Sequence, residues 1–411
     1  MEYAPLPEGL RLKRTSVSVP ATVQPRVKPA AMEPGLPEIV DPSGAMKHFY
    51  EALARTDRRE PGAITRVLHY GDSPVTADSI TADVRALLQR RFGDAGHGFV
   101  LIAKPWAWYG HRGVELKARG WRISPATQAR ARDGIHGLGG VSFEGGVGAV
   151  STVTLADGGH TKVEVDYLRE PGGGTFDVEA EGRTLGSVDT NGVKEPGFAA
   201  FALPEGTESV TLRVRQGTAR LFGWTFEKNG PGVIYHSLGL NGGQIQAVLR
   251  YFEPEQWAAQ LRHQRPDLVV INYGTNESVF PEYIERTYSD ELRKVIERVK
   301  AAVPEASVLV MGPMDRGERG ASGGIVTVPA LPRIVELQRR IAAETGCAFF
   351  DTFEAMGGAG TMGRWYEAQP RLVSADFMHP LPAGAAKVGA LLDGALMRGY
   401  ERSGGEGQAK K

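Results

Sequence analysis

The chain alternates short apolar runs with segments that repeat apolar residues at helical spacing, and this alternation constrains its fold most. The apolar runs have the length and composition of buried strands and lie at 67–70, 233–236, 268–273, 308–311 and 348–350. The segments with helical spacing lie at 44–56, 80–92, 282–303, 331–345 and 382–400. Apolar strands separated by amphipathic helices are typical of a parallel sheet covered by helices on both faces. The sequence therefore predicts an α/β fold.

The middle of the chain, from about residue 115 to 231, breaks this pattern. It has no helical stripe, and alternating apolar and polar residues occupy short runs at 150–155, 162–167, 175–180 and 209–215. Glycine, proline and asparagine separate these runs, and glycine is abundant in the whole chain, at 53 of 411 residues. Period-two alternation in closely spaced runs indicates an antiparallel β-sandwich. The sequence thus predicts an all-β module inserted into the α/β domain.

Five segments follow from these patterns. Residues 1–42 are rich in proline and are interpreted as an extended tether. Residues 43–114 and 232–402 form the two parts of the α/β domain, and residues 115–231 form the inserted β-sandwich. The last segment, 403–411, is predicted to be a flexible tail.

The composition excludes several classes of protein. Lysine plus arginine and aspartate plus glutamate both number 48, so the chain lacks the basic field that non-specific nucleic-acid binding requires. Its single cysteine, Cys347, excludes an internal disulfide and cysteine-rich metal sites. No run is apolar enough to predict a transmembrane helix. Residues 1–12 lack the apolar core of a signal peptide, which leaves a cytosolic protein or a mature form whose leader has been removed.

Polar or glycine-rich clusters follow the predicted strands, where open parallel sheets place their sites. Gly71-Asp72-Ser73 follows the first strand, and the glycine-rich segment 239–243 follows the strand at 233–236. Asn276 stands just after the strand at 268–273, and Asp376 precedes His379 by three positions near the C-terminus. Because the carboxyl ends of parallel strands meet at one edge, one crevice can collect all four clusters.

These residue types suit acyl transfer by an activated serine. Ser73 needs a base such as His379, and that imidazole needs an acceptor on its other nitrogen, which Asp376 supplies from three residues away. The N–H groups of Ser73 and Gly242 and the side-chain amide of Asn276 are candidate donors to the oxyanion. Gly239 and Gly243 compete with Gly242 for that role. Asp72 is interpreted as a residue that organises the turn before the nucleophile.

The four clusters, in this order, resemble those of the SGNH (GDSL-type) hydrolase superfamily. The resemblance covers residues 45–115 and 232–400. It implies a flavodoxin-like three-layer α/β/α fold and a Ser-His-Asp esterase mechanism. Pro74 departs from the residues common in the family at that position, which bears on substrate preference more than on catalysis.

Other segments resemble more closely the bacterial peptidoglycan O-acetylesterases and alginate O-acetyl-modifying enzymes. These segments are 92–98, 104–106, 137–140 and 235–242. Such esterases carry a β-sandwich (jelly-roll) insertion that resembles a carbohydrate-binding module, and here the predicted insertion falls in the same place. The resemblance implies an O-acetylated polysaccharide as substrate. Trp106, Trp108 and Tyr109 are candidate sugar-stacking residues, with core packing as the alternative.

The leading hypothesis is therefore a serine esterase that removes O-acetyl groups from a bacterial polysaccharide through an acetyl-enzyme. The alternatives are a polysaccharide O-acetyltransferase with the same triad and a non-catalytic glycan-binding protein. The sequence predicts no cofactor, no catalytic metal, no nucleic-acid partner and a monomer. A cell-wall substrate would place the protein outside the cytoplasm. The eight histidines other than His379 are assigned structural or solvated positions.

Overall fold

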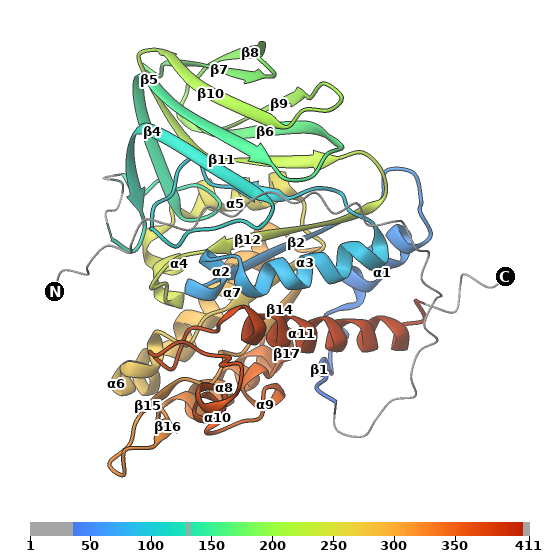
Figure 1. Ribbon diagram of the computed structural model, residues 1–411, viewed down its shortest axis with the longest axis vertical. Coiled ribbons are helices and arrows are strands. Elements are labelled where there is room, and N and C mark those ends of the chain that lie inside the picture. The colour runs from blue at the N-terminus through green and yellow to red at the C-terminus, as the bar shows by residue number, and fades with distance from the viewer. Residues whose placement is uncertain (1–35, 129–130, 132, 406–411) are drawn as a thin grey trace. The chain divides into compact units, whose positions relative to one another are not determined.

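The fold is that of a computed structural model, which describes residues 36–128, 131 and 133–405 (Figure 1). The central layer of the α/β part is a six-stranded sheet with the order β12-β2-β13-β14-β17-β1. The strands are β12 (Gly232–Gly239), β2 (Ile64–Gly71), β13 (Leu268–Asn272), β14 (Ser307–Met311), β17 (Ala348–Phe350) and β1 (Ile39–Val40). All neighbours pair in parallel except β1, which runs antiparallel to β17.

Helices cover both faces of this sheet. The helices packed on one face are α1 (Lys47–Asp57), α3 (Ser79–Phe92) and α11 (Pro382–Arg402). Those packed on the other face are α4 (Ile245–Tyr251), α5 (Pro254–Gln264), α7 (Ser289–Ala302) and α8 (Leu331–Glu344). Alternate residues of one strand serve the two layers: Val67 packs toward the first group and Leu68 toward the second. The parallel strands are buried on both faces, which explains their nearly continuous apolar sequence.

The remaining short elements lie between the main strands and helices. They are α2 (Ser73–Thr76), η1 (Glu277–Val279), α6 (Pro281–Tyr283), the π-helical η2 (Ile284–Tyr288), β15 (Gly317–Arg319), β16 (Ile325–Thr327), α9 (Thr352–Ala355) and α10 (Thr361–Glu367). The helix predicted over 282–303 is therefore interrupted by a π-helical stretch before α7.

A second sheet is antiparallel and contains the chain between α3 and β12. Its order is β8-β7-β10-β5-β11-β6-β9, with β4 paired to β5 and β3 paired to β11. Its strands are β3 (Gly98–Val100), β4 (Val114–Pro125), β5 (Val141–Leu155), β6 (His160–Arg169), β7 (Thr175–Ala180), β8 (Arg183–Asp189), β9 (Glu195–Ala202), β10 (Ser209–Gln216) and β11 (Thr218–Lys228).

This antiparallel sheet folds back on itself. Strands β6 and β7 are not neighbours in the sheet, yet the rings of Tyr167 and Phe176 lie edge to face with centroids 5.8 Å apart. Phe201 of β9 likewise packs against Gly186 of β8. Two layers with a shared apolar core explain the alternating sequence pattern of this segment. The sandwich also takes in Gly98–Val100, which precedes the predicted insertion.

The antiparallel sheet packs against the α/β layers through helix α5. The ring of His263 stacks on Phe198 of β9 with centroids 3.5 Å apart, and its Nε2 lies 2.7 Å from Glu164 of β6. Gln260 donates to the carbonyl of His136. One hydrophobic core therefore runs through both sheets.

The chain ends differ in part from the sequence prediction. Most of the predicted tether lies outside the described residues, but Ile39–Val40 joins the sheet as β1. Asp41 then accepts hydrogen bonds from the N–H groups of Ala45 and Met46 and so fixes the start of α1. Of the predicted tail, residues 406–411 lie outside the described part. Within the described part, none of the helices has the length and apolar content to cross a membrane.

Candidate active site

Ser73 lies at the carboxyl end of β2, where the chain turns sharply into the short helix α2. A Cβ at Gly71 would lie 2.5 Å from Cγ2 of Val75, and a Cβ at Gly239 would overlap the backbone of Thr76. Glycine at both positions therefore lets α2 sit directly on the ends of β2 and β12. Pro74 supplies a fixed φ at the first turn of α2. This packing holds the Ser73 side chain at the edge of the sheet, with 8% of the residue exposed.

Asp376 and His379 lie in a tight turn between α10 and α11. Oδ1 of Asp376 accepts hydrogen bonds from the Ser374 hydroxyl at 2.5 Å and from the N–H groups of Met378 and His379 at 3.0 Å. Phe377 takes a left-handed conformation, with φ of +57°, that closes the turn. Oδ2 of Asp376 is left to contact Nδ1 of His379 at 2.6 Å. The three-residue spacing thus brings carboxylate and imidazole together within one turn.

The carboxyl group of Asp376 stays ionised over a wide pH range. Burial raises its pKa, but the hydrogen bonds from Ser374, His379 and Met378 outweigh burial and lower the pKa to about 2. An ionised carboxylate accepts a hydrogen bond from the Nδ1–H of His379, which leaves Nε2 with its lone pair.

Ser73 and His379 are 306 positions apart in sequence, yet the Ser73 Oγ lies 2.8 Å from Nε2 of His379. Ser73 directly follows β2 at the carboxyl end of the parallel sheet, and His379 lies in the turn before α11, which reaches the same end of the sheet. A continuous hydrogen-bonded chain therefore runs from the Ser73 hydroxyl through the His379 imidazole to the Asp376 carboxylate. This is the arrangement of serine hydrolases, in which the base removes the proton of the nucleophile.

The structure brings the loops of two predicted oxyanion donors, Gly242 and Asn276, into contact. Among the described residues, the N–H groups of Ser73 and Gly242 donate to no protein acceptor. Gly243 is buried and donates to the carbonyl of Leu240 at 2.7 Å, whereas Gly242 is exposed. Gly242 is therefore better placed than Gly243 or the tightly packed Gly239. The amide of Asn276 donates one hydrogen bond, of 2.9 Å, to the carbonyl of Gly243 and keeps a second N–H.

Two further contacts join the loops that carry Gly242 and Asn276. Gln244 donates to the carbonyl of Asn276 at 3.2 Å, and the carboxyl group of Glu277 accepts from the N–H of Ile245 at 2.7 Å. Glu277 is fully buried, and burial raises its pKa to about 8. Glu277 thus carries its proton at neutral pH in the folded protein. Burial also raises the pKa of Asp72, to about 6.

We expect Glu277 to make the free energy of unfolding fall as pH rises. Below about pH 4.5 both states hold the proton; between there and pH 8 only the folded state holds it, so each increase in pH favours unfolding. Glu277→Gln keeps an acceptor for Ile245 without the ionisable proton. Urea unfolding at pH 5.5 and pH 9 measures the free energy of unfolding of both proteins. At pH 9 we expect the variant to be more stable than the wild type by an amount on the order of a few kcal/mol. An equal pH dependence in both proteins would contradict this.

Arg316 was not predicted as a site residue. Its guanidinium donates to the carbonyl of Thr275 at 2.9 Å and to the Ser278 hydroxyl at 3.3 Å, so it holds the loop that carries Asn276. One signal was present in the sequence, since Arg316 closely follows the strand β14. Nothing in its local pattern, however, distinguishes it from a solvated arginine.

The predicted sugar-stacking residues divide into two groups. Trp106 and Tyr109 are buried, and the Tyr109 hydroxyl accepts from the N–H of Leu101. The prediction is therefore wrong for these two residues, because their ring faces pack in the core. Trp108 is 55% exposed, and its Nε1 donates to Oδ1 of Asn241, the residue before Gly242. Trp108 alone of the three presents a surface beside the candidate oxyanion site.

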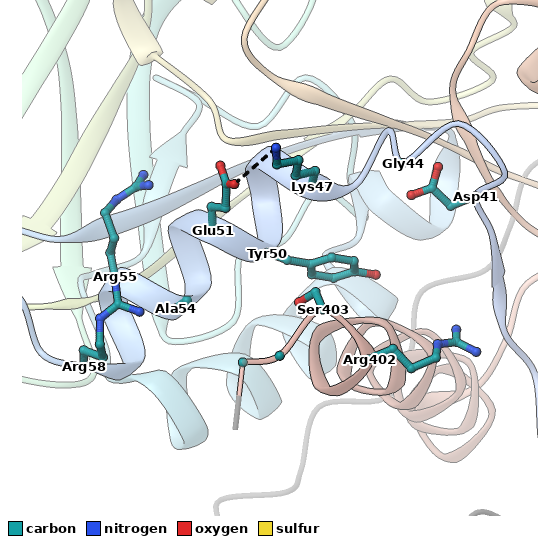
Figure 2. A pocket seen from close by; sticks show the side chains of 12 residues that line it. Asp41, Gly44, Lys47, Tyr50, Glu51, Ala54, Arg55, Arg58, Arg402 and Ser403 are labelled. Carbon is teal, nitrogen blue, oxygen red and sulfur yellow. Dashed lines mark ion pairs between the residues drawn. The ribbon is translucent and has the colours of Figure 1, made fainter. Parts of the chain in front are cut away.

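A separate surface hollow lies between α1 and the end of α11 (Figure 2). Charged side chains line it, among them Lys47, Glu51, Arg55 and Arg402. Lys47 and Glu51 form an ion pair of 3.8 Å across one turn of α1. None of the predicted site residues lines this hollow, so it is separate from the candidate active site.

Comparisons with known proteins give one family match and one shared fold. Residues 204–387 match the model of the GDSL-like Lipase/Acylhydrolase family, a range that includes Gly242, Asn276, Asp376 and His379 but begins after Ser73. The structure described as "Peptidoglycan O-acetylesterase in action, 5 min" superimposes with a TM-score of 0.74 at 22% identity, covering 89% of this chain and 99% of that one. A family two carbohydrate esterase from Clostridium thermocellum reaches a TM-score of only 0.30 at 14% identity, covering 63% and 95%. No curated protein matches in the sequence search.

Over residues 204–387 the chain is similar to the GDSL-like Lipase/Acylhydrolase family. Its fold is that of the described esterase structure, an SGNH α/β/α fold with an additional antiparallel β-rich region. The two findings together support a carboxylic ester hydrolase.

Proposed function

We propose that this protein is a serine esterase that removes O-acetyl groups from a bacterial cell-wall or extracellular polysaccharide. The observation that carries the proposal is the 2.8 Å contact between Ser73 Oγ and His379 Nε2, extended by the 2.6 Å contact to Asp376. An alcohol in that position is deprotonated as it attacks a carbonyl carbon.

In the first half of the proposed reaction, Ser73 attacks the acetyl carbonyl while His379 takes its proton. Asp376 holds the imidazole in the required tautomer and stabilises the imidazolium. The N–H groups of Ser73 and Gly242 and the amide of Asn276 donate to the oxyanion of the tetrahedral intermediate. His379 then protonates the departing sugar hydroxyl, and the acetyl-enzyme remains.

In the second half, His379 removes a proton from water, and the resulting nucleophile attacks the acetyl-enzyme. Collapse of the second tetrahedral intermediate releases acetate and returns the proton to Ser73. Every proton passes through groups of this chain, so the steps need no cofactor.

The substrate class is inferred from two sources. The structural neighbour with the same fold is described as a peptidoglycan O-acetylesterase. In this chain, the exposed Trp108 ring stands beside Asn241 and Gly242, where a sugar ring next to the scissile ester would lie. Aromatic rings suit the apolar faces of pyranose rings. A cell-wall substrate would place the protein outside the cytoplasm.

Acetate release tests the proposal directly. Wild-type protein and a Ser73→Ala control are incubated with O-acetylated peptidoglycan, acetylated xylan and acetylated alginate, and free acetate is measured. We expect release from at least one glycan that depends on Ser73. Acetyl groups that appear only as new esters on an added glycan acceptor, with no free acetate, would identify a transferase. No release from any glycan or from p-nitrophenyl acetate would overturn the esterase proposal.

Asn276→Ala should lower kcat by about 10²–10³-fold, because it removes one donor to the oxyanion. KM should change little, since that hydrogen bond strengthens mainly in the transition state. Initial rates with p-nitrophenyl acetate measure both constants. Asn276 also bonds the carbonyl of Gly243, so a thermal melt must accompany the rates. An unchanged kcat would remove Asn276 from the mechanism.

A further inference from the structure

A group of three histidines and one aspartate lies outside the proposed active site, where the antiparallel sheet meets the loops around β3. We name it the His97 cluster, and its members are His97, His111, Asp157 and His160. His97 directly precedes β3, and His111 lies in the loop between β3 and β4. Asp157 lies in the turn between β5 and β6, and His160 begins β6. The cluster therefore joins segments that are far apart in the sequence.

Three members bring their ligand atoms close together. One nitrogen of His97, one nitrogen of His160 and one carboxylate oxygen of Asp157 all lie within 4.8 Å of one another. His97 Nε2 lies 2.7 Å from Oδ1 of Asp157, and the rings of His97 and His160 stack with centroids 5.1 Å apart. His111 meets His97 edge to face at 5.5 Å.

His160 is buried without a hydrogen-bond partner. Only 2% of the residue is exposed, and neither ring nitrogen has a partner among the described residues. Nε2 of His111, a residue that is 7% exposed, also lacks one. A buried polar atom without a partner is unfavourable, so these nitrogens favour a ligand. Among the described residues, both ring nitrogens of His160 are therefore available to a ligand.

The charges around the cluster are favourable to a cation. The ammonium of Lys228 lies 2.5 Å from Oδ2 of Asp157 and 2.6 Å from Oδ2 of Asp94. Two carboxylates and one ammonium leave a net charge of minus one beside the imidazoles. The Lys228 ammonium contacts Oδ2 of Asp157, whereas Oδ1 of Asp157 contacts His97. The Asp157 side chain is 43% exposed, which gives an ion a route from solvent.

We propose that His97, Asp157 and His160 bind one divalent transition-metal ion, for which Zn²⁺ is the best match. Two imidazoles and one carboxylate form a typical ligand set for zinc, and water or the adjacent His111 completes the coordination. Tetrahedral zinc with bonds of about 2.0–2.2 Å sets its ligand atoms roughly 3.4 Å apart. Side-chain rotation would therefore separate the 2.7 Å pair of His97 and Asp157 and bring closer any pair that approaches the 4.8 Å limit.

The ion would fasten the start of β6 and the turn between β5 and β6 to the segment that leads from α3 into β3. His111 stands three residues after Trp108, in the loop that reaches the proposed active site. The proposed role is structural, because Ser73, His379 and Asp376 need no metal for their steps. The site departs from the sequence analysis, which left these histidines in structural or solvated positions.

Isothermal titration of EDTA-treated, full-length protein with ZnCl₂ tests the site. We expect binding of one equivalent, a rise in Tm on adding zinc, and visible absorption bands when Co²⁺ replaces zinc. His160→Gln and Asp157→Asn should each weaken binding by about 10–100-fold or more. Asp157 lies in an exposed turn, so Asp157→Asn tests the site even if His160→Gln fails to fold.

Two further variants sharpen the test. His263→Gln removes another histidine–carboxylate pair, with Glu164, and should leave zinc affinity unchanged. Lys228→Met removes the competing ammonium and should tighten zinc binding by a factor on the order of ten. Hydrolysis of p-nitrophenyl acetate should persist after EDTA treatment, which separates this proposal from the proposed esterase. Absence of stoichiometric binding, or equal affinity in wild type, Asp157→Asn and Lys228→Met, would overturn it.

Discussion

Ser73→Ala should lower kcat for p-nitrophenyl acetate and for acetylated glycan by a factor on the order of 10⁶. The substitution removes the Oγ atom that lies 2.8 Å from His379 and leaves nothing to form the acetyl-enzyme. Alanine fits the site, because the only hydrogen bond that the Ser73 hydroxyl makes among the described residues is the one to His379. Tm should therefore remain close to that of the wild type. Steady-state rates with acetate detection measure the loss.

Ser79→Ala is the matched control for this prediction. Ser79 begins α3, six residues after Ser73, and its hydroxyl donates to the carbonyl of Pro74 rather than to His379. We expect its activity to stay near that of the wild type. Comparable losses in the two variants would indicate damage to the turn and would remove Ser73 from the role of nucleophile.

Asp376→Asn should lower kcat on the order of 10⁴-fold at neutral pH. An amide in place of the carboxylate presents an N–H to Nδ1 of His379, which then must accept a hydrogen bond. The imidazole proton moves to Nε2, so His379 has no lone pair with which to deprotonate Ser73. Rates over a pH series measure the effect, with KM expected to change much less than kcat.

Ser374→Ala separates this effect from loosening of the turn. It removes one hydrogen bond to Oδ1 of Asp376 and leaves Oδ2 on His379. We expect a loss of roughly tenfold or less, because the tautomer of His379 is preserved. If Asp376→Asn lost no more activity than Ser374→Ala, the carboxylate would have no part in proton transfer.

The parallel sheet could be predicted because its signal is local. Each core strand is a short apolar run, and each long helix shows one apolar stripe, as in α3 and α8. Helices α4 and α5 were missed because α4 has only seven residues and α5 places Gln256 and Gln260 on its buried face. The hairpin of β15 and β16 was missed because three-residue strands in a glycine-rich segment carry no periodic pattern.

The exposure of the aromatic residues could not be read from sequence. Trp106 and Trp108 are two positions apart and equally apolar, yet one is 6% and the other 55% exposed. The difference arises because Trp106 turns into the core while Trp108 reaches Asn241 on a different loop. The same holds for His97 and His160, whose proximity depends on the pairing of β3, β11 and β6.

The sequence by itself determined the alternation of strands and helices, the position of the β-rich segment and the reactive residues that follow the strands. These depend on local spacing and on the rule that parallel strands end at one edge of their sheet. Only the tertiary structure decided that Ser73 meets His379 across 306 positions, that Gly242 rather than Gly243 keeps an unused N–H, and which rings reach the surface. Those outcomes depend on contacts between distant segments, and no local pattern encodes such contacts.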